Sequence, residues 1–321
     1  MRYLLIKTAP LMAALLLTAC AESEQPAAPA APEQTAEAAD LGDQIKQTVE
    51  QAAEKVKEAS AQVGLAAILA AQPEEVRARY VFRNPQQTLE FFGIEPGMTV
   101  VEALPGGGWY SKLLLPYLGA DGHLMGVNYA PDLWPNFSFA TEEMLAEMAT
   151  WTTTWTEGAE GWREADSATV SAFVFGDVDT SLHGTADAVL FVRALHNMAR
   201  FSSERDFLAE ALGNTYDILK PGGVVGIVQH EARADAPDDW ANGSNGYLKR
   251  DYVIAQMEAA GFEFIEASDV NQNPKDQPGT EDIVWRLPPS LATSRENEEL
   301  KAQMIAIGES NRMTLKFRKP A

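Results

Sequence analysis

The sequence predicts a doubly wound α/β fold, with a mostly parallel seven-stranded sheet and helices on both faces. Apolar strand segments alternate with helical segments, as in chains whose parallel strands are joined by crossover helices. A glycine-rich bend follows the first strand, and polar residues follow several others. The expected helices include residues 86–92, 109–118, 203–219 and 251–260. The expected strands are residues 99–104, 122–128, 170–175, 188–192, 224–229, 262–268 and 313–317.

The first 19 residues have the pattern of a secretory signal peptide. Arg2 and Lys7 supply positive charge, and residues 11–17 form an apolar stretch too short for a comfortable membrane span. The following Leu-Thr-Ala-Cys resembles the lipobox of bacterial lipoproteins, in which Cys20 becomes the acylated first residue. An ordinary cleaved signal with a chance Cys is the alternative. Cys20 is the only Cys, so its acylation excludes disulfides, thiolate metal sites and Cys nucleophiles.

Residues 20–64 are expected to connect this anchor to a folded domain of residues 65–321. Residues 21–40 are rich in Ala, Pro, Glu and Gln and predict a disordered tether. In residues 41–63, Ile45, Val49, Val56 and Val63 recur at helical spacing, which predicts one amphipathic helix.

The chain is strongly acidic, with a net charge of −21, and loss of the signal peptide with its two cations makes the mature chain about −23. Such a surface repels nucleic acid and anionic lipid head groups. We therefore expect no nucleic-acid partner and membrane attachment by the lipid anchor alone. The expected location is the bacterial cell envelope, facing the periplasm. Ala21 does not suggest the Asp-type inner-membrane retention signal, which favours the outer membrane.

The strongest chemical signal is the run Val-Val-Glu-Ala-Leu-Pro-Gly-Gly-Gly-Trp-Tyr over residues 100–110. A buried strand turns through glycines into the start of a helix. Glycines let the backbone approach a ligand closely, and a helix N-terminus offers free N–H groups. Doubly wound folds bind nucleotides at such a bend. By itself, a glycine cluster is as often only a tight turn.

The polar positions at the other strand ends strengthen this signal. In order, the strand-end residues Glu102, Asn128, Gly176 and Asp177, followed by Leu-Lys-Pro-Gly-Gly at 219–223, resemble the class I S-adenosylmethionine (SAM) methyltransferases, a Rossmann-like family, over roughly residues 82–320. More narrowly, the chain resembles a bacterial family of predicted methyltransferases that are often exported. Its marks are Arg-Asn-Pro at 83–85, residues 89–94 and 96–102, Pro-Gly-Gly-Gly-Trp-Tyr at 105–110, and Leu-Lys-Phe-Arg-Lys-Pro at 315–320.

The resemblance implies SAM as the cofactor and a role for each matching residue of the loop. Glu102 would face the SAM amino group. Pro105, Gly106, Gly107 and Gly108 would pass under the methionine part of the ligand. Replacing Gly107 or Gly108 by Val is therefore expected to abolish cofactor binding and leave the protein folded.

The adenosine part would lie against the next two strand ends. Asn128 stands at the ribose position, where most members of the class have an acid; an amide accepts from one hydroxyl and donates to the other. Asp177 would accept from the adenine amino group, and Gly176 would give backbone room. A nicotinamide alternative is disfavoured, because Ser111 ends the G-x-G-x-x-S run and Asn128 removes the acidic ribose contact.

Candidate catalytic residues follow the fourth and fifth strands. Methyl transfer needs alignment of the acceptor and often removal of its proton, and His titrates in the right range. His196, His230 and Asn197 are the candidates. For each His, a structural role bonded to a backbone carbonyl is an equal alternative. A metal site is not expected, because Glu231 is the single carboxylate beside the two histidines.

Two insertions lie near this edge. Residues 128–177 hold Trp134, Trp151, Trp155 and Trp162. Trp151 and Trp155 share a helix face, which favours a helix packed on the sheet over an aromatic lid. Residues 232–247 are rich in Asp, Asn and Gly and predict a mobile loop.

The sequence therefore predicts a SAM-dependent methyltransferase acting on a small, apolar or aromatic molecule. The alternative is a non-catalytic binding protein of the cell envelope built on the same fold. SAM is made in the cytoplasm, and Asn128 weakens the expected ribose contact; both favour the alternative. The sequence gives no indication of oligomeric state.

Overall fold

The computed structural model describes residues 36–321. The signal peptide, Cys20 and residues 21–35 of the expected tether lie outside the described residues. The chain divides into two units, residues 1–52 and 53–321, and helix α1 (Ala36–Ala71) contributes to both. Within residues 36–321, no helix has the length and apolarity of a membrane span.

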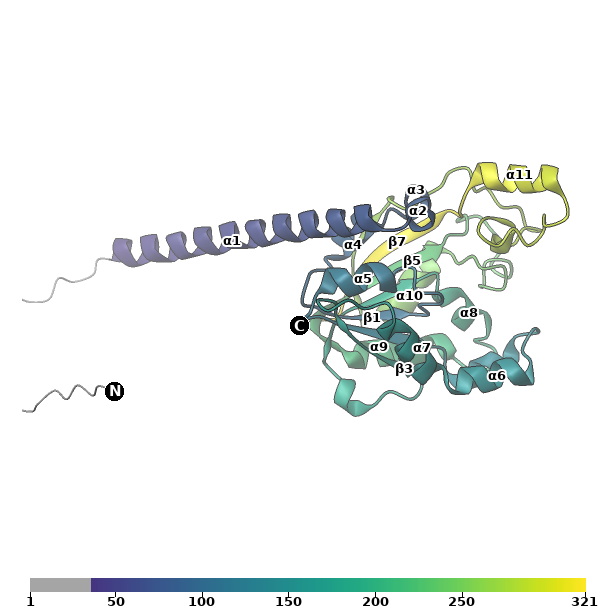
Figure 1. Ribbon diagram of the computed structural model, residues 1–321, viewed down its shortest axis with the longest axis horizontal. Coiled ribbons are helices and arrows are strands. Elements are labelled where there is room, and N and C mark those ends of the chain that lie inside the picture. The colour runs from purple at the N-terminus through teal and green to yellow at the C-terminus, as the bar shows by residue number, and fades with distance from the viewer. Residues whose placement is uncertain (1–35) are drawn as a thin grey trace, which may run out of the picture. The chain divides into compact units, whose positions relative to one another are not determined.

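A seven-stranded sheet forms the centre of the second unit, in the order β3-β2-β1-β4-β5-β7-β6 (Figure 1). The first five strands are parallel, while β7 runs antiparallel to β5 and to β6. The strands are β1 (Thr99–Ala103), β2 (His123–Asn128), β3 (Thr169–Val174), β4 (Ala186–Val192), β5 (Leu219–His230), β6 (Glu263–Ser268) and β7 (Arg312–Arg318). β1 and β4 are neighbours although β2 and β3 lie between them in sequence, so the chain reverses its winding direction between these two strands. Doubly wound folds bind ligands at such a switch point.

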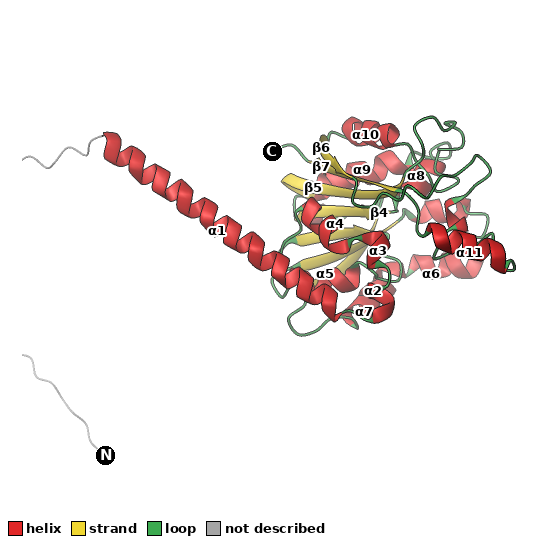
Figure 2. Cartoon of the chain, turned by 90° about the horizontal axis from the view of Figure 1, so that it is seen from above, coloured by secondary structure: helices red, strands yellow, loops and turns green. Residues whose placement is uncertain are grey.

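Helices cover both faces of the sheet (Figure 2). The α-helices beyond α1 are α2 (Glu74–Arg77), α3 (Tyr80–Arg83), α4 (Pro85–Phe92), α5 (Ser111–Leu118), α6 (Glu142–Ala149), α7 (Trp151–Glu160), α8 (Leu195–Arg200), α9 (Phe207–Ile218), α10 (Arg250–Ala259) and α11 (Glu298–Ile307). Three 3₁₀ helices complete the set: η1 (Pro131–Asn136), η2 (Thr180–Leu182) and η3 (Val284–Arg286).

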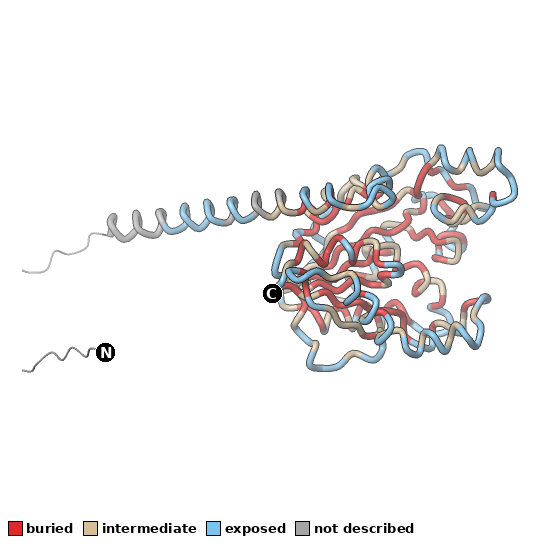
Figure 3. The backbone as a smooth tube through the Cα atoms, in the orientation of Figure 1, coloured by how far each residue is buried: buried red, intermediate tan, exposed pale blue. Residues whose placement is uncertain are grey.

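Alternate residues of each strand enter two separate apolar cores. Val100 packs with the end of α1 and with α4, α5 and α7, whereas Val101 packs with α8, α9 and α10. The inner strands β1, β2, β4, β5 and β7 are buried along most of their length, whereas the edge strands β3 and β6 are not (Figure 3). This two-sided burial explains why the parallel strands read as continuous apolar segments, and it confirms the predicted fold class.

The predicted elements are present with shifted ends. The helix expected at residues 203–219 begins at Phe207, because the Asp206 side chain accepts a hydrogen bond from the Ala209 N–H and caps the helix there. Helix α1 spans residues 36–71 rather than 41–63, so it includes the last part of the expected tether and crosses the expected boundary at residue 65. Its composition stays helix-favouring up to Pro73. Val49 and Val56 are exposed, and Leu65 and Leu69 are the helix residues buried in the core.

Candidate functional site

Glu102 lies inside the carboxyl end of β1 and is almost completely buried, with 3% exposure. Its carboxylate accepts a hydrogen bond of 2.6 Å from the Ser111 hydroxyl at the start of α5. Burial raises the pKa of Glu102 to about 7, and the Ser111 hydrogen bond and the charge of Arg193 offset part of that rise. Within the described residues, Glu102 makes no ion pair. A cationic ligand group would supply the partner that this carboxylate lacks.

The loop after β1 turns sharply, and three of its residues have left-handed backbone. Leu104, where a glycine would be the usual choice, has φ +55°, and Gly106 also has φ +55°. A Cβ on Gly107 would have no atom within 4 Å, so the middle of the loop is open. A Cβ on Gly108, at φ +74°, would collide with the indole ring of Trp162. The Trp162 side chain therefore covers one of the three glycines. Replacing Gly108 by Val would displace the Trp162 ring, so this variant would disturb the packing of the protein as well as the loop.

The residues expected to hold the adenosine have mostly local partners. The Asn128 side-chain oxygen accepts from the Tyr129 N–H at 2.8 Å, and Asn128 is buried. The Gly176 N–H donates to the Asn214 side chain at 2.8 Å. Asp177 is exposed just after β3. These residues stand at adjacent strand ends, as the sequence predicts, although Asn128 already uses its acceptor oxygen.

The two candidate histidines meet in one cavity. A cavity of about 220 Å³ lies at the carboxyl ends of β1, β4 and β5, and His196 and His230 both line it. Their ring centroids are 5.6 Å apart. Trp285 and Pro288 form part of its apolar wall. This volume is below the roughly 300–1,000 Å³ of drug-sized sites, so the cavity fits a small ligand.

Both histidines are neutral at physiological pH. Burial lowers the pKa of His196 to about 4 and, with the nearby His196 and Arg193, the pKa of His230 well below its usual value. His230 Nδ1 lies 2.6 Å from the Ser310 hydroxyl, and His196 Nδ1 lies 3.5 Å from the Gln229 amide. Neither bonds a backbone carbonyl through Nδ1.

Asn197, the third candidate, points elsewhere. Its amide donates to the Tyr129 hydroxyl at 3.0 Å, and it does not line the cavity. Asn197 thus joins α8 to the chain that follows β2, and its other amide atom, Oδ1, has no hydrogen-bond partner. No group of three or more His, Cys, Asp or Glu in residues 36–321 is arranged to hold a metal ion.

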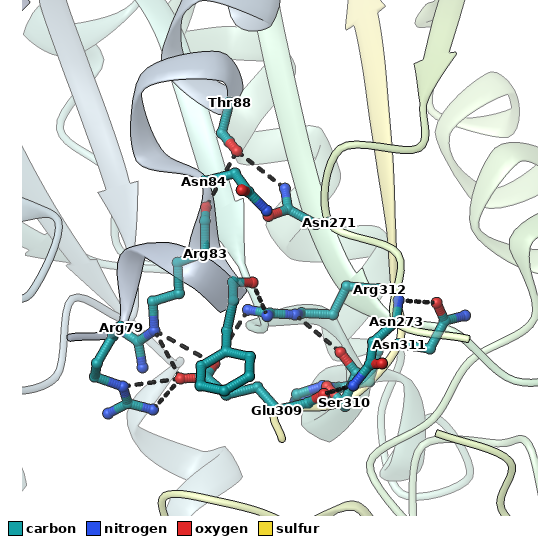
Figure 4. A network of polar contacts seen from close by, with 12 residues as sticks. Arg79, Arg83, Asn84, Thr88, Asn271, Asn273, Glu309, Ser310, Asn311 and Arg312 are labelled. Atoms are coloured by element: carbon teal, nitrogen blue, oxygen red, sulfur yellow. Dashed lines mark hydrogen bonds and ion pairs between the residues drawn. The ribbon is translucent and has the colours of Figure 1, made fainter. Parts of the chain in front are cut away.

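Three arginines surround Glu309 in a mostly buried network of polar contacts (Figure 4). Glu309 accepts from Arg79 at 2.8 Å and from Arg83 at 3.2 Å, and Arg312 lies 3.3 Å from its other oxygen. Burial alone would raise the pKa of Glu309, but the three guanidinium groups hold it below its usual value. Glu309, Ser310 and Arg193 all line the cavity.

The two insertions pack against the domain. Trp151 and Trp155 stack at 5.7 Å on α7, and the Trp155 ring lies so close to Gly126 that a Cβ there would be 2.8 Å from it. The expectation of a helix covering the sheet is confirmed for this pair. The expected mobile loop at residues 232–247 is wrong: it contains Trp240 and the fully buried Tyr247, which form a small apolar core with Val284. Local polarity in the sequence did not reveal these anchoring aromatics.

Several residues of the site were not identified from the sequence. Arg193 directly follows β4 and is the one charged residue at the end of an apolar run, which was an available signal. Glu309, Ser310 and Trp285 lie in residues 269–311, for which no local pattern indicates a site. The contact of Glu309 with Arg79 reaches over 230 residues, and Ser310 and Trp285 contact the distant His230 and His196.

Comparison with known proteins gives structural likenesses only. No family model matches the sequence, and no curated protein matches it. Among solved structures, the [4+2]-cyclase SpnF is 16% identical, with 74% of this chain and 80% of that chain covered, at a TM-score of 0.43. A SAM-dependent methyltransferase from Aquifex aeolicus is 18% identical, with 64% and 93% covered, at a TM-score of 0.41. An arsenic(III) SAM methyltransferase from Chlamydomonas reinhardtii is 14% identical, with 80% and 73% covered, at a TM-score of 0.38.

The strand order, with β7 antiparallel between β5 and β6, defines the class of fold: the chain has a doubly wound, Rossmann-like α/β fold. This statement rests on the sheet itself. A fold of this kind hosts many chemistries, so the activity has to be argued from the site.

Proposed function

We propose that the protein is a SAM-dependent methyltransferase that acts on a small molecule. The observation that carries the proposal is Glu102. It is a buried carboxylate without a cationic partner, placed at the end of β1 beside an open glycine loop. A carboxylate in this position costs free energy unless a ligand supplies a positive group. The amino group of SAM is such a group.

The chain fits SAM at the methionine end better than at the ribose end. Glu102 and the backbone around Gly106 and Gly107 would hold the amino acid part. Asn128 would contact the ribose with an amide N–H group, because its oxygen accepts from the Tyr129 N–H and its nitrogen makes only a long contact of 3.7 Å with the Met148 sulfur. Asp177 and Gly176 would adjoin the adenine. When bound, SAM supplies a methyl group already activated by its sulfonium.

Of the two histidines, His230 is the better candidate for removing the proton from the methyl acceptor. Its Nδ1–H can donate to the Ser310 hydroxyl, which leaves Nε2 as a free acceptor. At His196, an amide N–H of Gln229 points to Nδ1, which places the ring proton on Nε2 as a donor. The Gln229 amide assigns the His196 tautomer, whereas the Ser310 hydroxyl can donate or accept, so the His230 tautomer is part of the proposal. The two rings would thus hold the methyl acceptor between His230, which takes up its proton, and His196, which donates a hydrogen bond to it.

Binding and transfer are tested in sequence on the purified protein. Isothermal titration calorimetry with SAM should show binding that Glu102→Gln weakens by at least about tenfold, since charged hydrogen bonds contribute about 1.5–3 kcal/mol. Transfer of a labelled methyl group to small molecules from cell extract should fall more in His230→Gln than in His196→Gln. Absence of SAM binding at millimolar concentration would contradict the proposal.

A non-catalytic binding protein is the second candidate. Trp162 covers Gly108, and the side-chain oxygen of Asn128 already accepts a hydrogen bond from the Tyr129 N–H. The envelope location expected from Cys20 also separates the protein from cytoplasmic SAM. SAM binding without transfer to any extract component would favour this second function.

A further inference from the structure

Arg193 lines the cavity and carries a positive charge that no neighbouring carboxylate in residues 36–321 neutralises through an ion pair. Within the described part of the chain, its side chain makes no ion pair, and its Nε is buried with no hydrogen-bond partner. A guanidinium stays charged in proteins and presents five donors. Arg193 is partly buried, and burying part of a guanidinium without an anion costs free energy. The cavity beside it is where an anion would fit.

The surrounding charges leave an excess of positive charge. Arg79, Arg83 and Arg312 share the single carboxylate of Glu309. Burial and the charge of Arg193 lower the pKa of Arg83 to about 10, and burial and the charge of Arg312 lower the pKa of Arg193. Glu102 is the other acid close enough to interact with Arg193, and it is about half protonated at neutral pH. In a chain of net charge −21, this is a local exception.

Backbone conformation fixes Arg193 at the cavity. Arg193 has φ +62° and Leu104 has φ +55°, and both line the cavity from neighbouring strands. Non-glycine residues rarely adopt this conformation, and such strain concentrates at functional sites. The N–H groups of Leu104 and Arg193 are held by Val127 and Val228 of the adjacent strands.

We propose that this cavity binds a small molecule combining a flat apolar body with a carboxylate or phosphate group, which Arg193 receives. The flat body would lie against Trp285, Leu287 and the two prolines after it, and a guanidinium fork matches either anion. His196 and His230 are neutral, so they contribute no further charge. The assignment of this molecule as the methyl acceptor rests on the proposed function, whereas its binding requires only the cavity.

Calorimetry without SAM tests the inference on the full protein, with benzoate, phenyl phosphate, benzyl alcohol and benzylamine as probes. At least one of the two anions should bind about tenfold or more tightly than benzyl alcohol, and benzylamine more weakly. Arg193→Gln should remove this preference and leave benzyl alcohol unchanged. Arg193→Lys, which keeps the charge without the fork, should retain a reduced preference and serves if the Gln variant does not fold.

Arg318→Gln is the matched control, because it removes an exposed arginine paired with Glu263 at the far end of β7. It should bind all four probes like the unaltered protein. Equal affinity for benzoate, phenyl phosphate and benzyl alcohol, or no binding of either anion at millimolar concentration, overturns the inference, as does an anion preference that persists in Arg193→Gln. A protein that binds these anions but not SAM keeps this inference and loses the methyltransferase proposal.

Discussion

Replacing Glu102 by Gln should stabilise the protein at alkaline pH while weakening SAM binding. The pKa of Glu102 is raised from 4.5 to about 7, chiefly by burial. Because the folded state holds this proton more tightly than the unfolded state, the stabilisation it contributes is fully present below pH 4.5 and is lost as the pH rises through about 7. One pKa unit corresponds to about 1.36 kcal/mol. The complete loss is therefore about 3 kcal/mol, of which about 2.5 kcal/mol falls between pH 5 and pH 8.

Urea titrations at pH 5 and pH 8 measure this difference. The Gln side chain keeps an acceptor for Ser111 and carries no charge at either pH, so the stability of Glu102→Gln relative to the unaltered protein should rise by about 2.5 kcal/mol between them. Glu263→Gln is the control, since Glu263 is half-exposed and should show a change within about 0.5 kcal/mol. A relative stability that is the same at both pH values would refute the assignment of Glu102 as a buried, unpaired acid.

Two further changes test the packing and the titration of the site. Gly108→Ala should cost about 2–5 kcal/mol in a urea titration, because its Cβ collides with Trp162 and the backbone has φ +74°; Gly107→Ala should stay within about 0.5 kcal/mol. If Gly108→Ala and Gly107→Ala lowered the stability equally, the Trp162 ring would not lie against the loop. Adding Trp162→Ala to Gly108→Ala should restore part of the lost stability. His196→Gln should reduce the acid sensitivity of the protein: the pKa of His196 is lowered to about 4, so its stabilising contribution is present above 6.5 and falls by about 2 kcal/mol by pH 5. Thermal unfolding at pH 8 and pH 5 measures this, and an unchanged pH dependence would mean that His196 is not buried as a neutral group.

The elements that the sequence predicts correctly are those with local signals. The central parallel strands β1 and β4 are short, apolar and followed by turn residues, and their two-sided burial explains that pattern. His196 and His230 converge because carboxyl ends of neighbouring parallel strands share one edge of the sheet. The sequence therefore predicts the common location of the two histidines from the order of the strands that they follow.

The part of the site that escapes prediction depends on long-range contacts and on unusual backbone. Leu104 and Arg193 adopt left-handed conformations without the glycine that would announce them. Glu309 comes from a segment without a strand pattern and pairs with arginines more than 220 residues earlier. Trp162 lies within the insertion of residues 128–177, and its contact with Gly108 has no local signal in the sequence. Sequence periodicity carries no information on which side chain will cover a loop.

The two unbalanced charges of the site lie close together and still do not neutralise each other. Glu102 and Arg193 stand at the ends of neighbouring strands, with Glu102 aligned with Leu190, and Arg193 lowers the pKa of Glu102 without forming an ion pair. A direct pair would satisfy both groups. Instead, Glu102 turns to Ser111, and Arg193 lines the cavity. Keeping the buried Glu102 and the partly buried Arg193 apart costs stability, and such costs are typical of positions where ligands supply the missing partners. A cation at Glu102 and an anion at Arg193 would bring two ligands to adjacent strand ends, as a transfer reaction between them requires.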